Sequence, residues 1–241
     1  MNDHYRKNAR IAGALYFMGT VFGILSGVVG GEVIASIVTQ APLSGPDLLV
    51  IVNADAAQIT NGSFFALMMG LSLAAMTVFL YPVFKMDSEV LAMGMLLFRG
   101  ALEGTYYLLS VMALLTLVLL GTEYAASGAN SGLLSMGNVL YQFQGALGPV
   151  GSIIFLIGAT CLYISFYRTR LIPRWLTIWG LIGVVPFMAY ALLYFFHIKS
   201  DIGFYLQMVL APQELVMGLW LIIKGFDHEA LNRLSQAQIR L

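Results

Sequence analysis

The stretch that decides the fold of this chain is LAMGMLLFRGALEGTYYLLSVMALLTLVLL, residues 91–120. A transmembrane helix needs about 20 mainly apolar residues to cover about 30 Å of hydrocarbon, and this stretch is long enough. Two charged residues, Arg99 and Glu103, lie inside it. Charges within a span are expensive in lipid and usually face the interior of a helix bundle. The stretch therefore predicts a membrane helix whose polar side faces other helices.

Composition extends this conclusion to the whole chain, because 59% of its 241 residues are hydrophobic and only 10% are charged. Soluble domains carry roughly a quarter charged residues. The segments that are long and apolar enough to span are residues 11–35, 64–84, 91–120, 147–167, 175–196 and 204–224. We predict an all-α integral membrane bundle of six transmembrane helices, which forms a single domain over residues 1–241 and contacts the lipid bilayer.

The segments that connect these spans carry weaker patterns. Residues 48–52 form an apolar run that is too short to span, and Ser44 and Pro46 before it suit a helix start. We predict a short interfacial helix there, on the outer membrane surface. Residues 121–145 are rich in Gly, Ser, Asn and Gln, which predicts a loop with one helical turn near residues 139–143.

Orientation follows from the basic residues, because loops rich in Lys and Arg stay in the cytoplasm. With six spans both termini share a side, and that side receives ten of the 12 Lys and Arg residues, whereas the other side receives Lys199 alone. We predict an inner-membrane protein with both termini cytoplasmic. Residues 227–241 are then a cytoplasmic tail, which is either solvated or rests on the inner leaflet through a short helix with Leu231, Leu234 and Leu241 on one side.

Metal and cofactor sites have little support in the sequence. The single cysteine, Cys161, excludes an internal disulfide and a thiolate metal cluster. His4, His197 and His228 have no second ligand at helical spacing, which argues against a zinc or haem site. The formal net charge is +0 and gives no reason to expect a nucleic-acid partner. We predict no metal and no cofactor.

Glycine recurs at every fourth position of the first predicted span, at Gly19, Gly23, Gly27 and Gly31. Such a strip lets another helix backbone approach closely. The third span carries a shorter version, Gly100 and Gly104. Close packing within the bundle is the favoured interpretation, and a homodimer contact is the alternative.

Polar residues follow one side of the third span, because their spacing places on one helical stripe Arg99, Glu103, Tyr106 and Ser110. An arginine that precedes a glutamate by four residues is in the less favoured order for a pair within one helix. Arg99 therefore has reason to find a second acceptor. At the rise of an α-helix, Arg99 lies roughly 12 Å from the inner end of the third span and Glu214 roughly 15 Å from the outer end of the sixth. Glu214 is therefore the other ionisable residue near mid-membrane.

The sixth span carries further polar features beside Glu214. Pro212 removes a backbone donor inside the predicted helix, which predicts a kink. Gln207 lies on roughly the same helical face as Glu214. We therefore predict an intramembrane polar cluster made of Arg99, Glu103, Glu214, Tyr106, Ser110 and Gln207.

Two interpretations of this cluster stay open. In the structural one, Arg99 bridges both carboxylates and holds the third and sixth helices in register. In the functional one, a single arginine cannot neutralise two carboxylates, so one acid holds a proton or a cation and is suited to proton exchange. Both predict that Arg99→Ala harms folding. Only the second predicts that Glu103→Gln or Glu214→Gln leaves folding intact and abolishes activity.

Four further runs are RIAGALYFMGTVFGI at residues 10–24, FRGALEG at 98–104, LIPRWL at 171–176 and GLWLIIKGF at 218–226. These runs resemble those of DUF4386, a bacterial multi-pass membrane family catalogued as a domain of unknown function. The resemblance covers nearly the whole chain in the same order. It implies a multi-pass architecture, and it implies no substrate and no catalytic residue.

The first functional hypothesis is a transporter of a small solute or an ion, coupled to protons through the mid-membrane carboxylates. The alternative is a non-transporting accessory or sensory subunit of a membrane complex, in which a second copy or another membrane protein contacts the glycine strips. An intramembrane enzyme would need a nucleophile with a base, a carboxylate dyad or a metal. Arg99 beside both acids argues against a dyad, and we predict no enzymatic activity.

Overall fold

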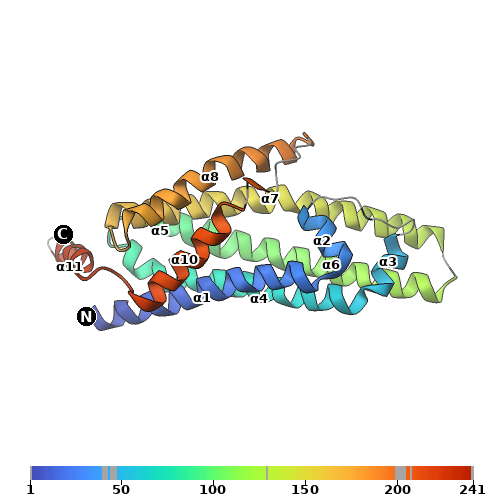
Figure 1. Ribbon diagram of the computed structural model, residues 1–241, viewed down its shortest axis with the longest axis horizontal. Coiled ribbons are helices and arrows are strands. Elements are labelled where there is room, and N and C mark those ends of the chain that lie inside the picture. Colours follow the sequence, from blue (N-terminus) through green and yellow to red (C-terminus); the bar gives the residue numbers. More distant parts are fainter. Residues whose placement is uncertain are drawn as a thin grey trace. The chain divides into compact units, whose positions relative to one another are not determined.

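The computed structural model describes residues 2–39, 43, 48–128, 130–198, 205–206 and 208–239, and every element in these residues is a helix (Figure 1). Within them, five helical stretches are long and apolar enough to cross a membrane: His4–Val29, Ala56–Phe84, Glu89–Ala126, Ser131–Thr169 and Arg174–Phe195. The first lies in α1 (Asn2–Val29), and the second and fifth are α4 (Ala56–Phe84) and α8 (Arg174–Phe195). The all-α class and the membrane-embedded, multi-pass character of the chain are thereby confirmed.

The sixth predicted span, residues 204–224, is only partly described, because residues 204 and 207 lie outside the described residues. The apolar helix found there is α10 (Leu210–Ile223), which has 14 residues. At 1.5 Å per residue it covers about 21 Å, which is less than the hydrocarbon thickness of about 30 Å. The count of six spans is therefore not confirmed.

The first predicted span, residues 11–35, is wrong beyond Val29, where α1 ends. The chain bends at Gly30 and starts a separate helix, α2 (Gly31–Thr39), with Gly31 at φ +74°. Residues with a side chain rarely adopt this φ, so a glycine ends the helix here. The Glu32 backbone N–H then donates to Asp55 Oδ2 at 3.0 Å, which holds the bend.

The predicted loop at residues 121–145 is also wrong. The helix α6 (Glu103–Ala126) continues through its first part, and α7 (Ser131–Thr169) occupies most of the rest. The apolar residues of this stretch lie at helical spacing and pack against a hydrophobic cluster, and they are Leu133, Leu134, Leu140 and Tyr141. This periodicity outweighs the Gly, Ser, Asn and Gln content, because burial of an apolar stripe stabilises a helix more than composition disfavours it.

The contacts divide the chain into two compact units. The first unit contains Met1–Thr20, Leu71–Gly104 and Pro149–Leu241, and the second contains Val21–Gly70 and Thr105–Gly148. Four helices contribute residues to both units: α1, α4, α6 and α7. Each unit is described below by itself.

The second unit is built around an apolar cluster of nine buried residues: Val33, Ile34, Leu48, Leu49, Val52, Ile59, Leu114, Leu117 and Tyr124. The predicted short helix is present as α3 (Leu48–Ala54), although Ser44 and Pro46 lie outside the described residues. Its residues Leu49 and Val52 are fully buried in the apolar cluster. The placement of this helix on the membrane surface therefore stays a prediction.

The C-terminal tail, predicted as residues 227–241, contains a helix, α11 (His228–Ile239). The residue before this helix is bound to another part of the first unit, because the Asp227 backbone N–H donates to the Leu171 carbonyl at 2.9 Å. Leu231 is fully buried, so this leucine contacts protein rather than lipid or solvent. Leu241 lies outside the described residues.

Candidate functional site

Arg99 lies on a π-helical segment that interrupts a longer helix. The helix begins as α5 (Glu89–Met95), widens into η1 (Leu96–Leu102) and continues as α6. At the junction the Glu103 backbone N–H reaches the carbonyl of Phe98, five residues earlier. Such i→i−5 bonding is rare in proteins and is frequent at functional sites. The backbone that carries both charges of the third span is therefore itself unusual.

Two glycines let other helices come close to this π-helical segment. A Cβ placed on Gly158 of α7 would lie 2.5 Å from the backbone nitrogen of Arg99 and 2.9 Å from its Cα. A Cβ on Gly100 would lie 2.7 Å from Thr77 Oγ1 of α4. The backbone of α7 thus touches the backbone at Arg99, which fixes the position of the arginine.

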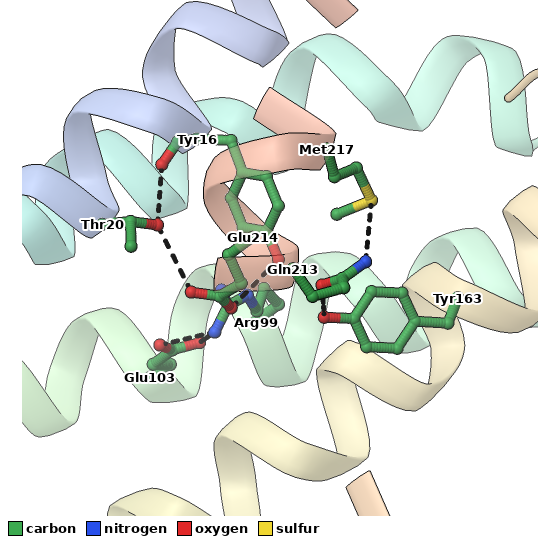
Figure 2. A network of polar contacts seen from close by, with 8 residues as sticks. All are labelled: Tyr16, Thr20, Arg99, Glu103, Tyr163, Gln213, Glu214 and Met217. Atoms are coloured by element: carbon green, nitrogen blue, oxygen red, sulfur yellow. Dashed lines mark hydrogen bonds and ion pairs between the residues drawn. The ribbon is translucent and has the colours of Figure 1, made fainter. Parts of the chain in front are cut away.

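The guanidinium of Arg99 forms ion pairs with two carboxylates (Figure 2). Its Nη1 donates to Glu103 Oε1 at 2.9 Å and Oε2 at 3.0 Å, and its Nη2 donates to Glu214 Oε1 at 2.9 Å. Arg99 and Glu103 are each 1% exposed and Glu214 is 8% exposed. The bridge joins η1 and α6 to α10 in a region that is nearly closed to solvent.

Side chains from α1 and α7 complete the surroundings of Arg99. Tyr16 Oη donates to Glu214 Oε1 at 3.0 Å, and Thr20 Oγ1 lies 3.3 Å from Glu214 Oε2 and also contacts the Tyr16 carbonyl. The guanidinium carbon lies 4.3 Å from the centroid of the Phe155 ring, within the range of a cation–π interaction. Arg99 Nε has no hydrogen-bond partner among the described residues. The positive charge is thus surrounded by two acids and an aromatic face.

A second branch begins at Gln213, the residue before Glu214. Tyr163 Oη of α7 donates to Gln213 Oε1 at 2.8 Å. Gln213 Nε2 contacts Met217 Sδ at 3.7 Å (Figure 2). The same nitrogen donates to the Leu176 carbonyl of α8 at 3.0 Å. We call the following set the polar network: Tyr16, Thr20, Arg99, Glu103, Tyr163, Gln213 and Glu214. All of its members lie in the first unit.

Comparison with known families agrees with these observations. Residues 11–225 match the family described as Domain of unknown function (DUF4386). The chain belongs to the DUF4386 family. No curated protein and no solved structure matches it. The DUF4386 match covers the π-helical segment and every residue of the polar network, so the network lies within the family region of the chain.

The other predicted members of the cluster in this DUF4386 chain are Tyr106, Ser110 and Gln207. Tyr106 and Ser110 belong to the second unit. There the Tyr106 ring packs edge-on against Tyr107, with centroids 4.9 Å apart, and Ser110 Oγ accepts from Gln144 Nε2 at 2.5 Å. Gln207 lies outside the described residues. Of the predicted four-residue stripe, Arg99 and Glu103 are the residues whose hydrogen bonds, as described above, form the network.

Pro212 lies at the start of a helix, and the kink predicted at this proline stays a prediction, because residue 207 before it lies outside the described residues. The helix α10 begins at Leu210, so Pro212 lies in its first turn. The missing N–H of a proline is tolerated there, because the first N–H groups of a helix have no partner within it. Glu214, four residues after Leu210, is consequently in the second turn of α10.

The glycines of the predicted strip do not all pack closely against another helix. A Cβ on Gly23 would lie 2.7 Å from Met69 Sδ, whereas a Cβ on Gly27 would meet no atom within 4 Å. Gly31 starts α2 at positive φ, and Gly19 is buried. Gly104 is uncrowded, because its nearest atom is Ala74 Cβ at 3.8 Å. The closest approach of α1 and α10 instead uses Gly13 and Gly218.

Sequence reasoning missed four polar residues of the network: Tyr16, Thr20, Tyr163 and Gln213. None is charged, and tyrosine and threonine are common in membrane helices, so they do not stand out. Gln213 carried the best available signal, because it directly precedes the mid-membrane acid Glu214.

The polar network contains one cation and two carboxyl groups, so one carboxyl group can bind and release a proton while the other pairs with the cation. A metal would need more ligands, and in the described part of the chain no group of three or more His, Cys, Asp or Glu is placed to hold one. The chemistry of this DUF4386 site is therefore that of Arg99, Glu103, Glu214 and the hydroxyls beside them.

Proposed function

We propose that this protein transports a small solute or an ion and couples that transport to protons through Glu103 and Glu214. The observation that carries the proposal is one arginine, Arg99, between two buried carboxylates. If both carboxylates were ionised, the three residues would hold one uncompensated negative charge. Such a charge is costly to bury, and a proton on one carboxylate removes it. An acid that holds a proton inside the membrane is typical of pumps and transporters.

The length of α10 also supports this proposal. The helix has 14 residues and carries Glu214 in its second turn. Transporter sites are often formed where a membrane helix is interrupted, because the free backbone groups at the break face the substrate or the coupling ion. The first N–H groups of α10 are of this kind.

The test is a flux measurement on purified protein in lipid vesicles that contain a pH-sensitive dye. A panel of amino acids, sugars, organic acids and inorganic ions is added outside under an imposed pH gradient. We expect one solute class to change the internal pH, and we expect Glu103→Gln and Glu214→Gln to abolish this change while the helical content is kept. Glu123→Gln is the matched control, because Glu123 lies on the same helix α6 and is exposed. Absence of pH-coupled flux for every solute would contradict the proposal.

The second candidate is a non-transporting accessory or sensory subunit. It is favoured by the arrangement of Arg99, which donates to both carboxylates while only 1% exposed. In this case the polar network is a structural bridge between helices. Glu103→Gln and Glu214→Gln would then lower the unfolding temperature, no variant would change a flux, and the protein would co-purify with another membrane protein in mild detergent.

We further infer an inner-membrane location with both termini cytoplasmic and with α10 as part of a sixth crossing. The asymmetry of the Lys and Arg residues supports this orientation. A variant that lacks Cys161 allows single cysteines to be labelled with a membrane-impermeant thiol reagent. We expect Ser127→Cys, after α6, to react in intact cells and Lys85→Cys, after α4, to react only after permeabilisation. The reverse pattern would overturn the orientation.

A further inference from the structure

The two carboxylates of the polar network receive unequal numbers of hydrogen bonds. Glu214 has three donors within reach: Arg99 Nη2 at 2.9 Å, Tyr16 Oη at 3.0 Å and Thr20 Oγ1 at 3.3 Å. Among the described residues, Glu103 accepts hydrogen bonds from Arg99 Nη1 alone. The side chain of Glu103 is 2% exposed and that of Glu214 is 10% exposed. Glu103 is thus both the drier and the less hydrogen-bonded of the two.

Hydrogen bonds donated to a carboxylate favour its ionised form, and removal from water favours its neutral form. Both effects act in the same direction here. When a pair of carboxylates shares one proton, the proton resides on the member whose anion is less well stabilised. By this criterion it resides on Glu103.

We propose that Glu103 holds the proton as a neutral carboxylic acid, while Glu214 stays ionised as the counter-ion of Arg99. This inference rests on the proposed function and names the acid that performs the proton exchange. In the exchange the O–H bond of Glu103 breaks, the proton passes to water, and the electron pair remains on the carboxylate. Arg99 Nη1 is already within hydrogen-bond distance of both Glu103 oxygens and stabilises the anion that forms.

Among the described residues, the ionisable groups found to act on Glu103 belong to the polar network. Arg99 is one turn earlier on the same helix, Glu214 comes from α10 and Tyr163 from α7. Tyr16 and Thr20 of α1 act indirectly, through their hydrogen bonds to Glu214. They are positioning residues, because they decide which of the two carboxylates is ionised without exchanging the proton themselves.

The test is infrared difference spectroscopy of the full-length protein in phosphatidylcholine vesicles, recorded while the pH is raised. A neutral carboxyl group absorbs at the C=O stretch of a carboxylic acid, and this band disappears on ionisation. We expect a band from a buried acid in the wild type and in the exposed control Glu123→Gln. We expect loss of that band in Glu103→Gln and in Glu214→Gln, because each leaves one carboxylate as the ionised counter-ion of Arg99. Glu103→Asp and Glu214→Asp, each produced with aspartate that carries a ¹³C side-chain carboxyl, separate the two acids. The band should move to lower frequency in labelled Glu103→Asp, and a shift in labelled Glu214→Asp instead would reverse the assignment.

The double variant Tyr16→Phe/Thr20→Val gives a second measurement if Glu103→Gln does not fold. It removes two of the three donors to Glu214 and so weakens the stabilisation of its anion. We therefore expect the shared proton to move toward Glu214 and the carboxylic-acid band to change in frequency. An unchanged spectrum would overturn the role of these donors and with it the assignment. A wild type without any band would overturn both this inference and proton coupling. The expected bands without any solute flux would leave the assignment standing and refute transport.

Discussion

The polar network of the first unit and the apolar cluster of the second unit hold helices together by opposite means. The network uses directional hydrogen bonds and ion pairs around Arg99, and each partner depends on the others. The apolar cluster uses contact area among side chains such as Leu49 and Leu117, and each residue contributes separately. A buried ion pair that loses one member leaves an uncompensated charge, whereas an apolar core that loses one side chain leaves a cavity. The two regions should therefore fail differently when single residues are changed.

The largest effect is expected for Arg99→Ala, which removes the cation that pairs with both Glu103 and Glu214. Removal of one partner from a buried ion pair costs about 3–5 kcal/mol. We expect the free energy of unfolding, measured by titration with a denaturing detergent, to fall by that amount. The control is Arg168→Ala, because the ion pair of Arg168 with Asp87 has the same length of 2.9 Å but an arginine side chain that is 53% exposed. Exposed pairs contribute about 0–1 kcal/mol, so equal losses in both variants would contradict this view of the network.

Leu49→Ala tests the apolar cluster in the same way. Leu49 of α3 is fully buried, and truncation of a buried leucine costs about 2–5 kcal/mol, so we expect roughly 3 kcal/mol. Val50, the next residue on the helix, is 55% exposed and gives the matched control Val50→Ala. Leu49→Met keeps most of the volume and should recover most of the loss, since volume-conserving changes are tolerated in apolar cores. If Leu49→Ala and Val50→Ala unfold alike, α3 does not pack as described.

Gly158→Ala tests whether the polar network depends on the close approach of the α7 backbone to the backbone at Arg99. The added methyl group would lie 2.5 Å from the Arg99 backbone nitrogen, so α7 and the π-helical segment must separate. Overpacking of this kind costs about 1–3 kcal/mol. Gly104→Ala is the control on the neighbouring helix, because its new Cβ would be 3.8 Å from the nearest atom. Alanine favours a helix over glycine by about 1 kcal/mol, so Gly104→Ala should be neutral or stabilising. A stability loss in Gly104→Ala equal to that in Gly158→Ala would contradict the close approach as its cause.

The same contrast explains which features were predictable from the sequence. Arg99, Glu103 and Glu214 were recognised because a charge in an apolar stretch needs a partner. The apolar cluster was missed because almost every segment is apolar, so its members have no distinguishing residue type. Its segment at residues 121–145 was assigned from its Gly, Ser, Asn and Gln content, although its apolar residues recur at helical spacing.

The π-helical segment could not be predicted from residues 96–102 alone. Its neighbours Thr77 and Gly158 are far away in sequence, and the close approach of Gly158 becomes visible only when α7 is in place. Gln207 was predicted because, on one helix over residues 204–224, it shares a face with Glu214. Gln213 does not share that face, yet it joins the network through its hydrogen bond with Tyr163, and Gln207 lies outside the described residues.

The smallest effect is expected at Ser110 and Gln144, a buried polar pair in the second unit. Gln144 Nε2 donates to Ser110 Oγ, and Gln144 Oε1 has no hydrogen-bond partner among the described residues. Ser110→Ala leaves the amide without its acceptor and should cost about 1 kcal/mol, whereas Ser110→Ala/Gln144→Leu removes both polar groups and should restore the free energy of unfolding to the wild-type value or above it. Because neither residue is charged, we expect this recovery here and not in the network, where Arg99→Met/Glu103→Gln still leaves Glu214 without its cation. A double variant less stable than Ser110→Ala would show that the pair stabilises the second unit as the ion pairs stabilise the first.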